Sequence, residues 1–233
     1  MDSIDFNDGF IILIDKPLRV TSFYVVDQIQ KAYKRTRKQK LKIGHAGTLD
    51  PLATGLLILC TGKMTKKISQ FQDMEKTYSG TFQLGASTPS YDLETEVENH
   101  KDISTITQED LERTRNSFMG YQELKPPAHS AIKLNGKRAY ELARKGLQPE
   151  MPLKPLYISR FDLDTLQLPE LSFRISCTKG TYIRSIANEF GARLNNAAYL
   201  SSLHRESIGD FSASTAFSLD GFLEKLNSNV DVI

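Results

Sequence analysis

The spacing of hydrophobic residues along the chain predicts both strands and helices. Strand-length apolar or alternating runs are typical of buried and half-buried strands, and they lie at residues 9–14, 56–60, 76–85 and 171–178. Apolar residues three or four positions apart indicate helices, and this pattern begins at Thr21-Ser22, spans 108–118 and 136–146, and returns after Gly180-Thr181. Because these elements are interspersed without regular β-α-β alternation, we expect an α+β fold. Its central sheet should be mixed, mostly antiparallel and flanked by helices.

The length of the chain bounds its domain organisation. The 233 residues suffice for one large domain or two small ones, and for a core that needs neither disulfide nor metal. The acidic stretch from Ser87 to Ser104 is predicted to be an exposed connection and is a candidate lobe boundary. We nevertheless expect one domain over residues 1–233, because the elements on both sides depend on each other. After Phe211 the pattern predicts one short helix, at about residues 215–226.

Composition excludes several classes of protein. Hydrophobic residues make up 39% and charged residues 25% of the chain, as in ordinary soluble domains. No apolar run is longer than the five residues of Leu56–Cys60, far fewer than the roughly 18 residues of a membrane helix, and the acidic N-terminus is no secretory signal. Cys60, Cys177 and four scattered histidines lack the spacing of zinc ligands. We expect a cytoplasmic protein without a membrane segment, a metal or a disulfide.

Charge is nearly balanced overall, at a net +2, but it is unevenly distributed. Seven lysines and arginines lie between Lys31 and Lys42 without an acid, and Lys63, Lys66 and Lys67 follow. Eight acids and one lysine lie between Asp92 and Glu112. Such separation favours a polyanion, such as a nucleic acid, as the partner of the basic part, although a solvated helix face also explains a charge run.

Two charged residues are candidates for chemistry. Asp50 lies in a turn with glycines at 44, 47 and 55, which let a backbone approach a ligand closely. The alternative is a turn residue before Pro51 that bonds to its own backbone. Arg184 lies in the first turn of the helix after Gly180-Thr181. It is either a clamp for a carboxylate or an exposed helix arginine.

Tyrosines and histidines supply weaker candidates. Tyr78 and Tyr182 can stack on an unpaired base, but Tyr78 shares its strand face with apolar residues and can equally be a core aromatic. Tyr182 can equally pack against the start of its helix. His45 can contact a phosphate or ribose, or complete a turn, and His129 is predicted to be a loop histidine.

Six segments, in this order, resemble the sequence blocks of TruB-type tRNA pseudouridine synthases. They are DKP at 15–17 with TS at 21–22, GHAGTLDPLATG at 44–55, KTY at 76–78, PPAHSAIK at 126–133, GKRAYELAR at 136–144 and KGTYIRS at 179–185. The match covers roughly residues 9–211. It implies the pseudouridine synthase fold, with an active-site cleft on one face of the sheet. It also implies an isomerase that flips the T-loop uridine of tRNA (position 55) into a pocket and converts it to pseudouridine.

The resemblance assigns roles by position. Asp50 matches the catalytic aspartate, Arg184 the arginine that pairs with it, and Tyr78 the tyrosine that stacks on the flipped base and can take its C5 proton. The substrate-binding positions that it implies are His45, Tyr182, Leu203, Lys16 and Lys66. It implies no metal and no cofactor, the T arm of tRNA as the partner, and a monomer.

The chain also departs from the family pattern. Arg19 occupies the usual position of a glycine, and His129 replaces the usual tyrosine or phenylalanine. The sequence ends at Ile233, so we expect a catalytic domain without the C-terminal RNA-binding (PUA) domain that many members carry. Two alternatives stay open: an RNA-binding or tRNA-folding protein on the same scaffold, and a carboxylate-dependent hydrolase such as a glycosidase, which usually needs a second carboxylate.

Overall fold

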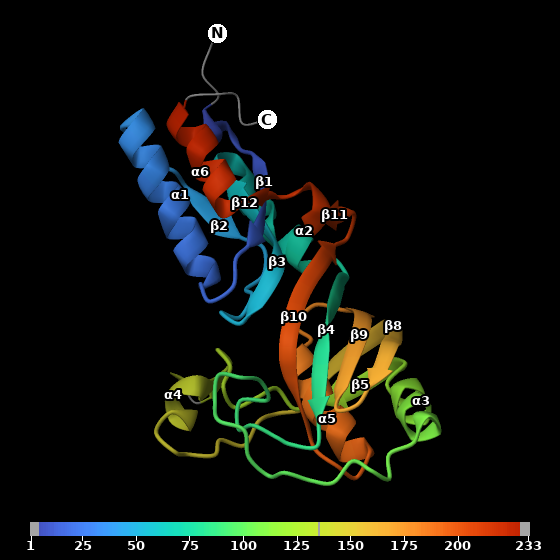
Figure 1. Ribbon diagram of the computed structural model, residues 1–233. Helices are drawn as coiled ribbons and strands as arrows, with labels where there is room; N and C mark the ends of the chain where they lie inside the picture. Colours follow the sequence, from blue (N-terminus) through green and yellow to red (C-terminus); the bar gives the residue numbers. More distant parts are fainter. Residues whose placement is uncertain (1–4, 135, 229–233) are drawn as a thin grey trace. The chain divides into compact units, whose positions relative to one another are not determined.

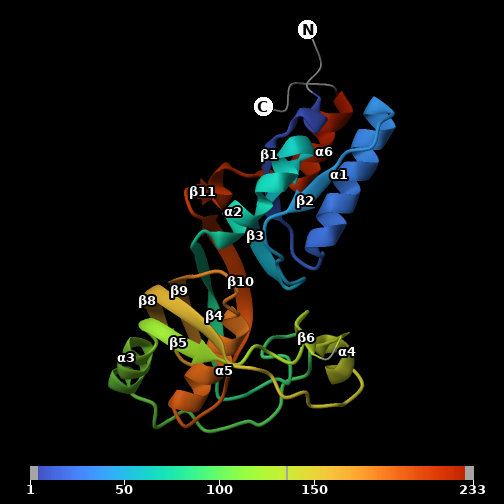
Figure 2. The ribbon, with the colours of Figure 1, turned by 180° about the vertical axis from the view of Figure 1, so that it is seen from behind.

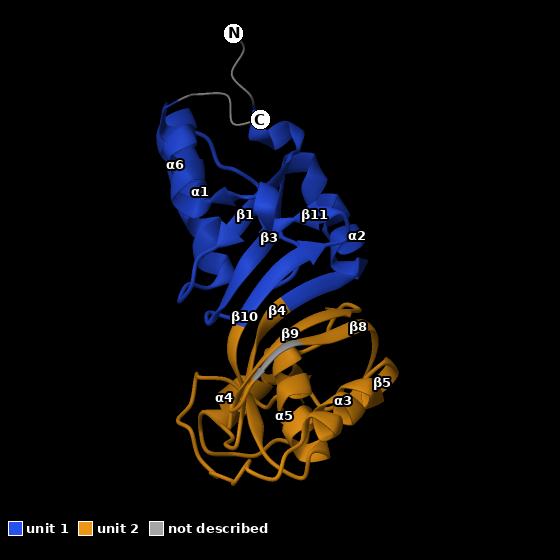
Figure 3. Cartoon of the chain, turned by 45° about the vertical axis from the view of Figure 1, so that its right-hand side comes forward, with its two compact units in different colours: residues 1–78, 203–233 blue, residues 79–202 orange. Residues whose placement is uncertain are grey.

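The computed structural model describes residues 5–134 and 136–228, which divide into two compact units. Unit 1 comprises residues 1–78 and 203–233, and unit 2 comprises residues 79–202 (Figure 3). The division falls within two strands, β4 (Lys76–Leu84) and β10 (Ala198–Ile208). The acidic segment 87–104 lies wholly within unit 2, so the predicted lobe boundary there is wrong.

Unit 1 consists of sheet strands with helices packed on them. Its further strands are β1 (Ile11–Lys16), β2 (Ile43–His45), β3 (Ala53–Thr61), β11 (Phe211–Ser212) and β12 (Phe217–Ser218). Its α-helices are α1 (Ser22–Arg37), α2 (Ile68–Asp73) and α6 (Leu219–Ser228), and 3₁₀ turns span Phe6–Asp8, Gly62–Lys67 and Ala213–Thr215. The strand order is β12-β1-β3-β10, with β2 paired to β3 and β11 to β10.

The pairing in unit 1 is mixed. β3 runs antiparallel to β1, from Ile11 opposite Cys60 to Lys16 opposite Gly55, and parallel to β10, with Leu203 opposite Ala53. β12 is parallel to β1, whereas β2 is antiparallel to β3. This register brings the start of β3, just after Asp50, beside the second half of β10.

Helix α1 begins where the sequence predicts, because Thr21 caps it. The Thr21 hydroxyl accepts a hydrogen bond from the Tyr24 backbone N–H at 3.0 Å. The buried stripe of α1 packs into a core that includes Phe6 and the buried residues of α6, and α1 and α6 lie side by side in both views (Figures 1 and 2). The predicted terminal helix therefore exists, at 219–228 rather than 215–226.

Unit 2 has its own sheet and helices. Its strands, besides parts of β4 and β10, are β5 (Gly120–Leu124), β6 (Lys133–Leu134), β7 (Lys137–Arg138), β8 (Lys154–Gln167) and β9 (Glu170–Cys177). Its helices are α3 (Gln108–Ser117), α4 (Ala139–Ala143) and α5 (Ile183–Arg193). The strand order is β4-β9-β8-β5, β6 and β7 form a separate hairpin, and β8 is antiparallel to β5 and β9. The mixed, mostly antiparallel α+β architecture is thus confirmed.

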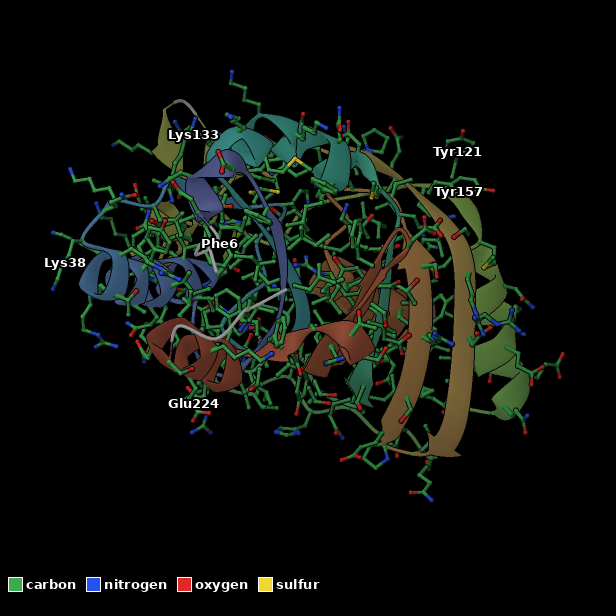
Figure 4. All side chains as sticks on the ribbon, turned by 90° about the horizontal axis from the view of Figure 1, so that it is seen from above. Phe6, Lys38, Tyr121, Lys133, Tyr157 and Glu224 are labelled. Atoms are coloured by element: carbon green, nitrogen blue, oxygen red, sulfur yellow. The ribbon has the colours of Figure 1, made fainter. Side chains whose placement is uncertain are left out.

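Phenylalanines form the core of unit 2. The rings of Phe82 and Phe173 stack with centroids 4.2 Å apart, and Phe118 stacks on Phe190. Burial of Tyr78, Phe82 and Leu84 confirms the predicted inward face of β4. On the outside, Tyr121 of β5 and Tyr157 of β8 form an exposed edge-to-face pair (Figure 4).

Two predictions for unit 2 are wrong. The helix expected at 136–146 is shortened to α4, because Lys137 and Arg138 pair with β6 instead. The segment 87–104 is not simply exposed, since Thr88, Ser90 and Asp92 are buried. The hydroxyls of Thr88 and Ser90 both donate to the Asp92 carbonyl, at 2.6 and 3.0 Å. Among the described residues, no helix has both the length and the apolar character needed to span a membrane.

Candidate active site

The loop of residues 46–52, between β2 and β3, carries Asp50 and is called the Asp50 loop below. Asp50 is half-buried, and its carbonyl accepts a hydrogen bond from the Ala53 N–H at 3.0 Å. Gly47 has a φ of +118° and Gly55 a φ of +103°, a region that favours glycine. A Cβ at Gly55 would lie 2.3 Å from the Arg205 carbonyl oxygen. Glycine is therefore required at position 47 in the loop and at position 55 in β3, just after the loop.

Arg205 of β10 lies buried beneath the Asp50 loop, 1% exposed. Its Nε donates to the Leu56 carbonyl at 2.8 Å, and its Nη2 donates to the Gly47 carbonyl at 3.1 Å. The two contacts join backbone on either side of Asp50. Arg205 was not predicted as a site residue, because nothing in its local sequence pattern distinguishes a buried strand arginine from an exposed one.

Lys16 is fully buried at the end of β1. Its Nζ donates to the Pro17 carbonyl at 2.9 Å and to the Val20 carbonyl at 2.8 Å. The pKa of Lys16 is lowered from 10.5 to about 8, chiefly by burial. The Asp50 carboxylate opposes this shift, and the charge of Arg205 adds to it. Lys16 is therefore a buried cation whose pKa depends on the charge of Asp50. Lys66, the other lysine that the sequence predicts for the site, lies in the 3₁₀ turn and is exposed.

His45 is half-buried and is the last residue of β2, directly before the Asp50 loop. Burial lowers its pKa, and the nearby Arg205 charge lowers it further. His45 is therefore neutral at pH 7, so that its ring offers hydrogen bonds rather than a positive charge. Its Nδ1 is buried and has no hydrogen-bond partner within the described part of the chain.

Leu203 and Tyr78 lie at the limits of unit 1. Leu203 is half-buried opposite Ala53, next to the end of the Asp50 loop. Its neighbour His204 places Nδ1 2.9 Å from the Thr54 hydroxyl. Tyr78 is buried on β4, 8% exposed. Together with Lys16, His45 and Asp50, these residues place most of the predicted site in unit 1.

Arg184 and Tyr182 belong to unit 2. Tyr182 occupies the N-cap position of α5 and is half-buried. Arg184 is 4% exposed, and its Nε lies 3.5 Å from Oδ2 of the buried Asp92. Its Nη1 donates to the carbonyls of Ser90 at 3.2 Å and His129 at 3.1 Å. The alternative of an exposed helix arginine is therefore wrong, whereas the pairing of Arg184 with Asp50, in the other unit, stays a prediction.

The segment from Lys125 to Ser130 contacts Arg184 and contains buried polar atoms at His129 and Ser130. The Ser185 hydroxyl donates to the Lys125 carbonyl at 2.7 Å and fixes the start of this segment on α5. The Ser130 hydroxyl and Nδ1 of His129 are buried without a hydrogen-bond partner among the residues described. Such unsatisfied atoms are costly unless a ligand or water completes them.

Comparisons with known proteins identify the family. The family described as TruB family pseudouridylate synthase (N terminal domain) matches residues 34–183. A protein named tRNA pseudouridine synthase B from Flavobacterium johnsoniae is 46% identical over 95% of this chain and 98% of its own length. A protein of the same name from Chloroherpeton thalassium is 48% identical, over 94% of this chain and 91% of its own length. The chain belongs to the TruB family.

Solved structures support the fold of this TruB family member. A chain in the crystal structure of a Cbf5-Nop10-Gar1 complex superposes with a TM-score of 0.71 at 24% identity, over 94% of this chain. The present chain covers 54% of that one, and at this low identity the likeness shows the fold alone. The predicted family, the pseudouridine synthase fold and the predicted enzyme class, an isomerase that forms pseudouridine, are confirmed.

Asp92 lies against Arg184 in this TruB family member and was not predicted from the sequence. It lies in the acidic segment that was expected to be exposed, and only the tertiary fold brings it to Arg184. Its Oδ1 also accepts a hydrogen bond from the Glu94 N–H at 3.0 Å. Within the described ranges, no three histidine, cysteine, aspartate or glutamate side chains form a cluster that could hold a metal ion.

Proposed function

We propose that this TruB family enzyme converts the T-loop uridine of tRNA to pseudouridine, with Asp50 as the essential carboxylate. Relatives named tRNA pseudouridine synthase B match nearly the whole chain, which supports tRNA as the substrate. The observation that carries the assignment is the setting of Asp50. It is half-buried on a glycine-dependent loop, beside a buried lysine whose pKa responds to its charge.

The reaction needs an ionised carboxylate. The bond from ribose C1′ to base N1 breaks, the base turns, and C1′ joins C5. The proton on C5 is lost and N1 gains one, so that the product is an isomer of the substrate. Asp50 acts as nucleophile or base in this sequence. At pH 7 Lys16 is largely protonated, because its pKa is about 8, and its attraction to Asp50 favours the charged forms of both groups.

Further side chains bind the flipped base and take its C5 proton. Extruding a base from its stack costs a few kcal/mol, and stacking on an aromatic ring stabilises the extruded base by about 1–3 kcal/mol. Tyr78 provides that ring, and its hydroxyl removes the C5 proton. Arg184 pairs with Asp50 when substrate is bound, Tyr182 packs under the site and Leu203 lines the pocket. His45, neutral because of burial and Arg205, forms hydrogen bonds to the flipped nucleotide.

Exposed lysines supply the sequence-independent part of RNA binding. The lysines of the run 31–42 are exposed, as are Lys63, Lys66 and Lys67. Contacts of this kind bind phosphates and position the RNA without reading its sequence. The enzyme acts as a monomer on the T arm, in the cytoplasm where tRNA matures, and needs no cofactor.

Tritium release from T-arm RNA labelled at C5 of uridine tests the proposal. Asp50→Asn keeps the shape of the side chain and removes its charge. We expect tRNA binding within about threefold of wild type and a single-turnover rate reduced at least a hundredfold, a barrier increase of about 2.7 kcal/mol. Asp210→Asn, at an exposed aspartate of the same unit, is the matched control and should keep the wild-type rate.

The same assay separates the alternatives. Tight binding without tritium release by the wild-type protein would favour an RNA-binding or tRNA-folding protein. Free uracil in place of pseudouridine would favour a hydrolase. A rate for Asp50→Asn above about a hundredth of wild type would show that Asp50 is not the essential carboxylate.

A further inference from the structure

The backbone of the Asp50 loop is held from three directions within unit 1. Arg205 binds the carbonyl of Gly47 at the start of the loop and that of Leu56 in β3, beyond its end. The Arg19 N–H, in the turn between β1 and α1, donates to the Pro51 carbonyl at 2.7 Å. Between these anchors, the residue directly before Asp50 is held by a side chain of α1.

That side chain is Ser22, the first residue of α1, which is 1% exposed. Its hydroxyl accepts a hydrogen bond from the Leu49 N–H at 2.9 Å and donates one to the Leu49 carbonyl at 3.2 Å. A single hydroxyl thus satisfies both peptide groups of Leu49, which is itself 3% exposed. The Leu49 carbonyl belongs to the peptide bond that leads into Asp50.

The hydroxyl of Ser22 is not needed to start the helix. Thr21 is the N-cap, and its hydroxyl receives the Tyr24 N–H. The two adjacent hydroxyls therefore have separate roles: that of Thr21 caps the start of the helix, and that of Ser22 binds the Asp50 loop. This division provides a matched pair of variants at neighbouring positions.

We propose that Ser22 is a positioning residue for Asp50, a role that rests on the proposed function of that aspartate. Without its hydroxyl, both peptide groups of Leu49 lose their partner in a buried environment, where an unsatisfied polar group is unfavourable. The loop then shifts to reach water or new partners. A displacement of about 1 Å at a reacting group can cost about a hundredfold in rate.

Ser22→Ala tests the proposal, with Thr21→Ala as the control. For Ser22→Ala we expect a single-turnover rate at saturating tRNA reduced about 10- to 100-fold, a dissociation constant for tRNA within twofold of wild type, and faster hydrogen exchange at the Leu49 amide. Thr21→Ala removes a helix cap and should lower the melting temperature. Its rate and its Leu49 exchange should remain within twofold of wild type, at a temperature where all variants are folded.

The outcomes are distinguishable. A wild-type rate in Ser22→Ala, while Asp50→Asn is inactive, would overturn the positioning role and leave the proposed function intact. Equal rate losses in Ser22→Ala and Thr21→Ala would show a general effect of α1 stability and would also overturn it. Full activity in Asp50→Asn would overturn the proposed role of Asp50 itself, and with it the need to position it.

Discussion

Arg19 holds a backbone conformation that side chains rarely adopt. Its φ is +65°, in the left-handed region that costs a non-glycine residue about 1–2 kcal/mol. Glycine avoids that cost and keeps the N–H that donates to Pro51, but its unfolded chain has more entropy to lose. We expect Arg19→Gly to match or exceed wild-type stability by up to about 1 kcal/mol, and Arg19→Val to lose at least about 1 kcal/mol. Urea unfolding measures both, and equal stability of the two variants would contradict this account.

Lys16 should give folding a specific pH dependence. Its pKa is about 8 in the folded protein against an ordinary value of 10.5. Between these values the unfolded chain binds more protons, so stability rises with pH through this window. The buried charge therefore opposes folding below pH 8, by roughly 3 kcal/mol at most, and this cost fades towards pH 10.5.

Lys16→Met removes this titration. Its unfolding free energy should therefore rise less between pH 8 and pH 10 than that of the wild type, as followed by urea unfolding at closely spaced pH values. Other groups titrate equally in both proteins and cancel in the comparison. Superimposable pH profiles would mean that Lys16 is not a charged group buried on folding.

At the scale of elements, α1 has two distinct ends. Its first turn binds the Asp50 loop through Ser22, and its last turn is basic and leads into Lys38, which points away from the helix (Figure 4). Not every basic residue there is available to RNA, because Arg35 donates to the Asn227 side chain at 2.8 Å and Arg37 is half-buried. The exposed lysines are the stronger candidates for phosphate contacts.

Salt dependence tests that end of the helix. Changing Lys34, Lys38, Lys40 and Lys42 together to glutamine should weaken tRNA binding and reduce the slope of log affinity against log salt by two or more units, since each phosphate contact contributes close to one. The same four positions changed to arginine keep the charge and should keep the slope. Catalysis at saturating tRNA should be within twofold of wild type. An unchanged slope in the glutamine variant would indicate a solvated surface that does not meet RNA.

At the scale of the whole molecule, the candidate residues come from both compact units. Asp50, Lys16, His45 and Leu203 belong to unit 1, and Arg184 and Tyr182 belong to unit 2. Unit 1 is assembled from both ends of the chain, and unit 2 is the continuous segment 79–202 between them. Neither unit by itself contains the complete set of candidate residues.

Local patterns were sufficient for several elements. The Thr21 cap, the inward face of β4 and the α+β class follow from capping chemistry and from apolar periodicity, which act over a few residues. The glycine-rich loop around Asp50 was also recognisable, because positive φ angles at 47 and 55 require glycine. The hairpin that shortens the helix at 136–146 was not, since strand pairing overrides local helix preference there.

What the sequence by itself determined is the family, the α+β class and the identity of the chemical groups. What only the tertiary structure decided is which polar groups are buried and with whom they pair. Asp92 and Arg205 carry no local mark, yet one lies against Arg184 and the other binds the backbone on both sides of Asp50. Burial of a charge depends on contacts between residues more than 90 positions apart, and such contacts exist only once the chain has folded.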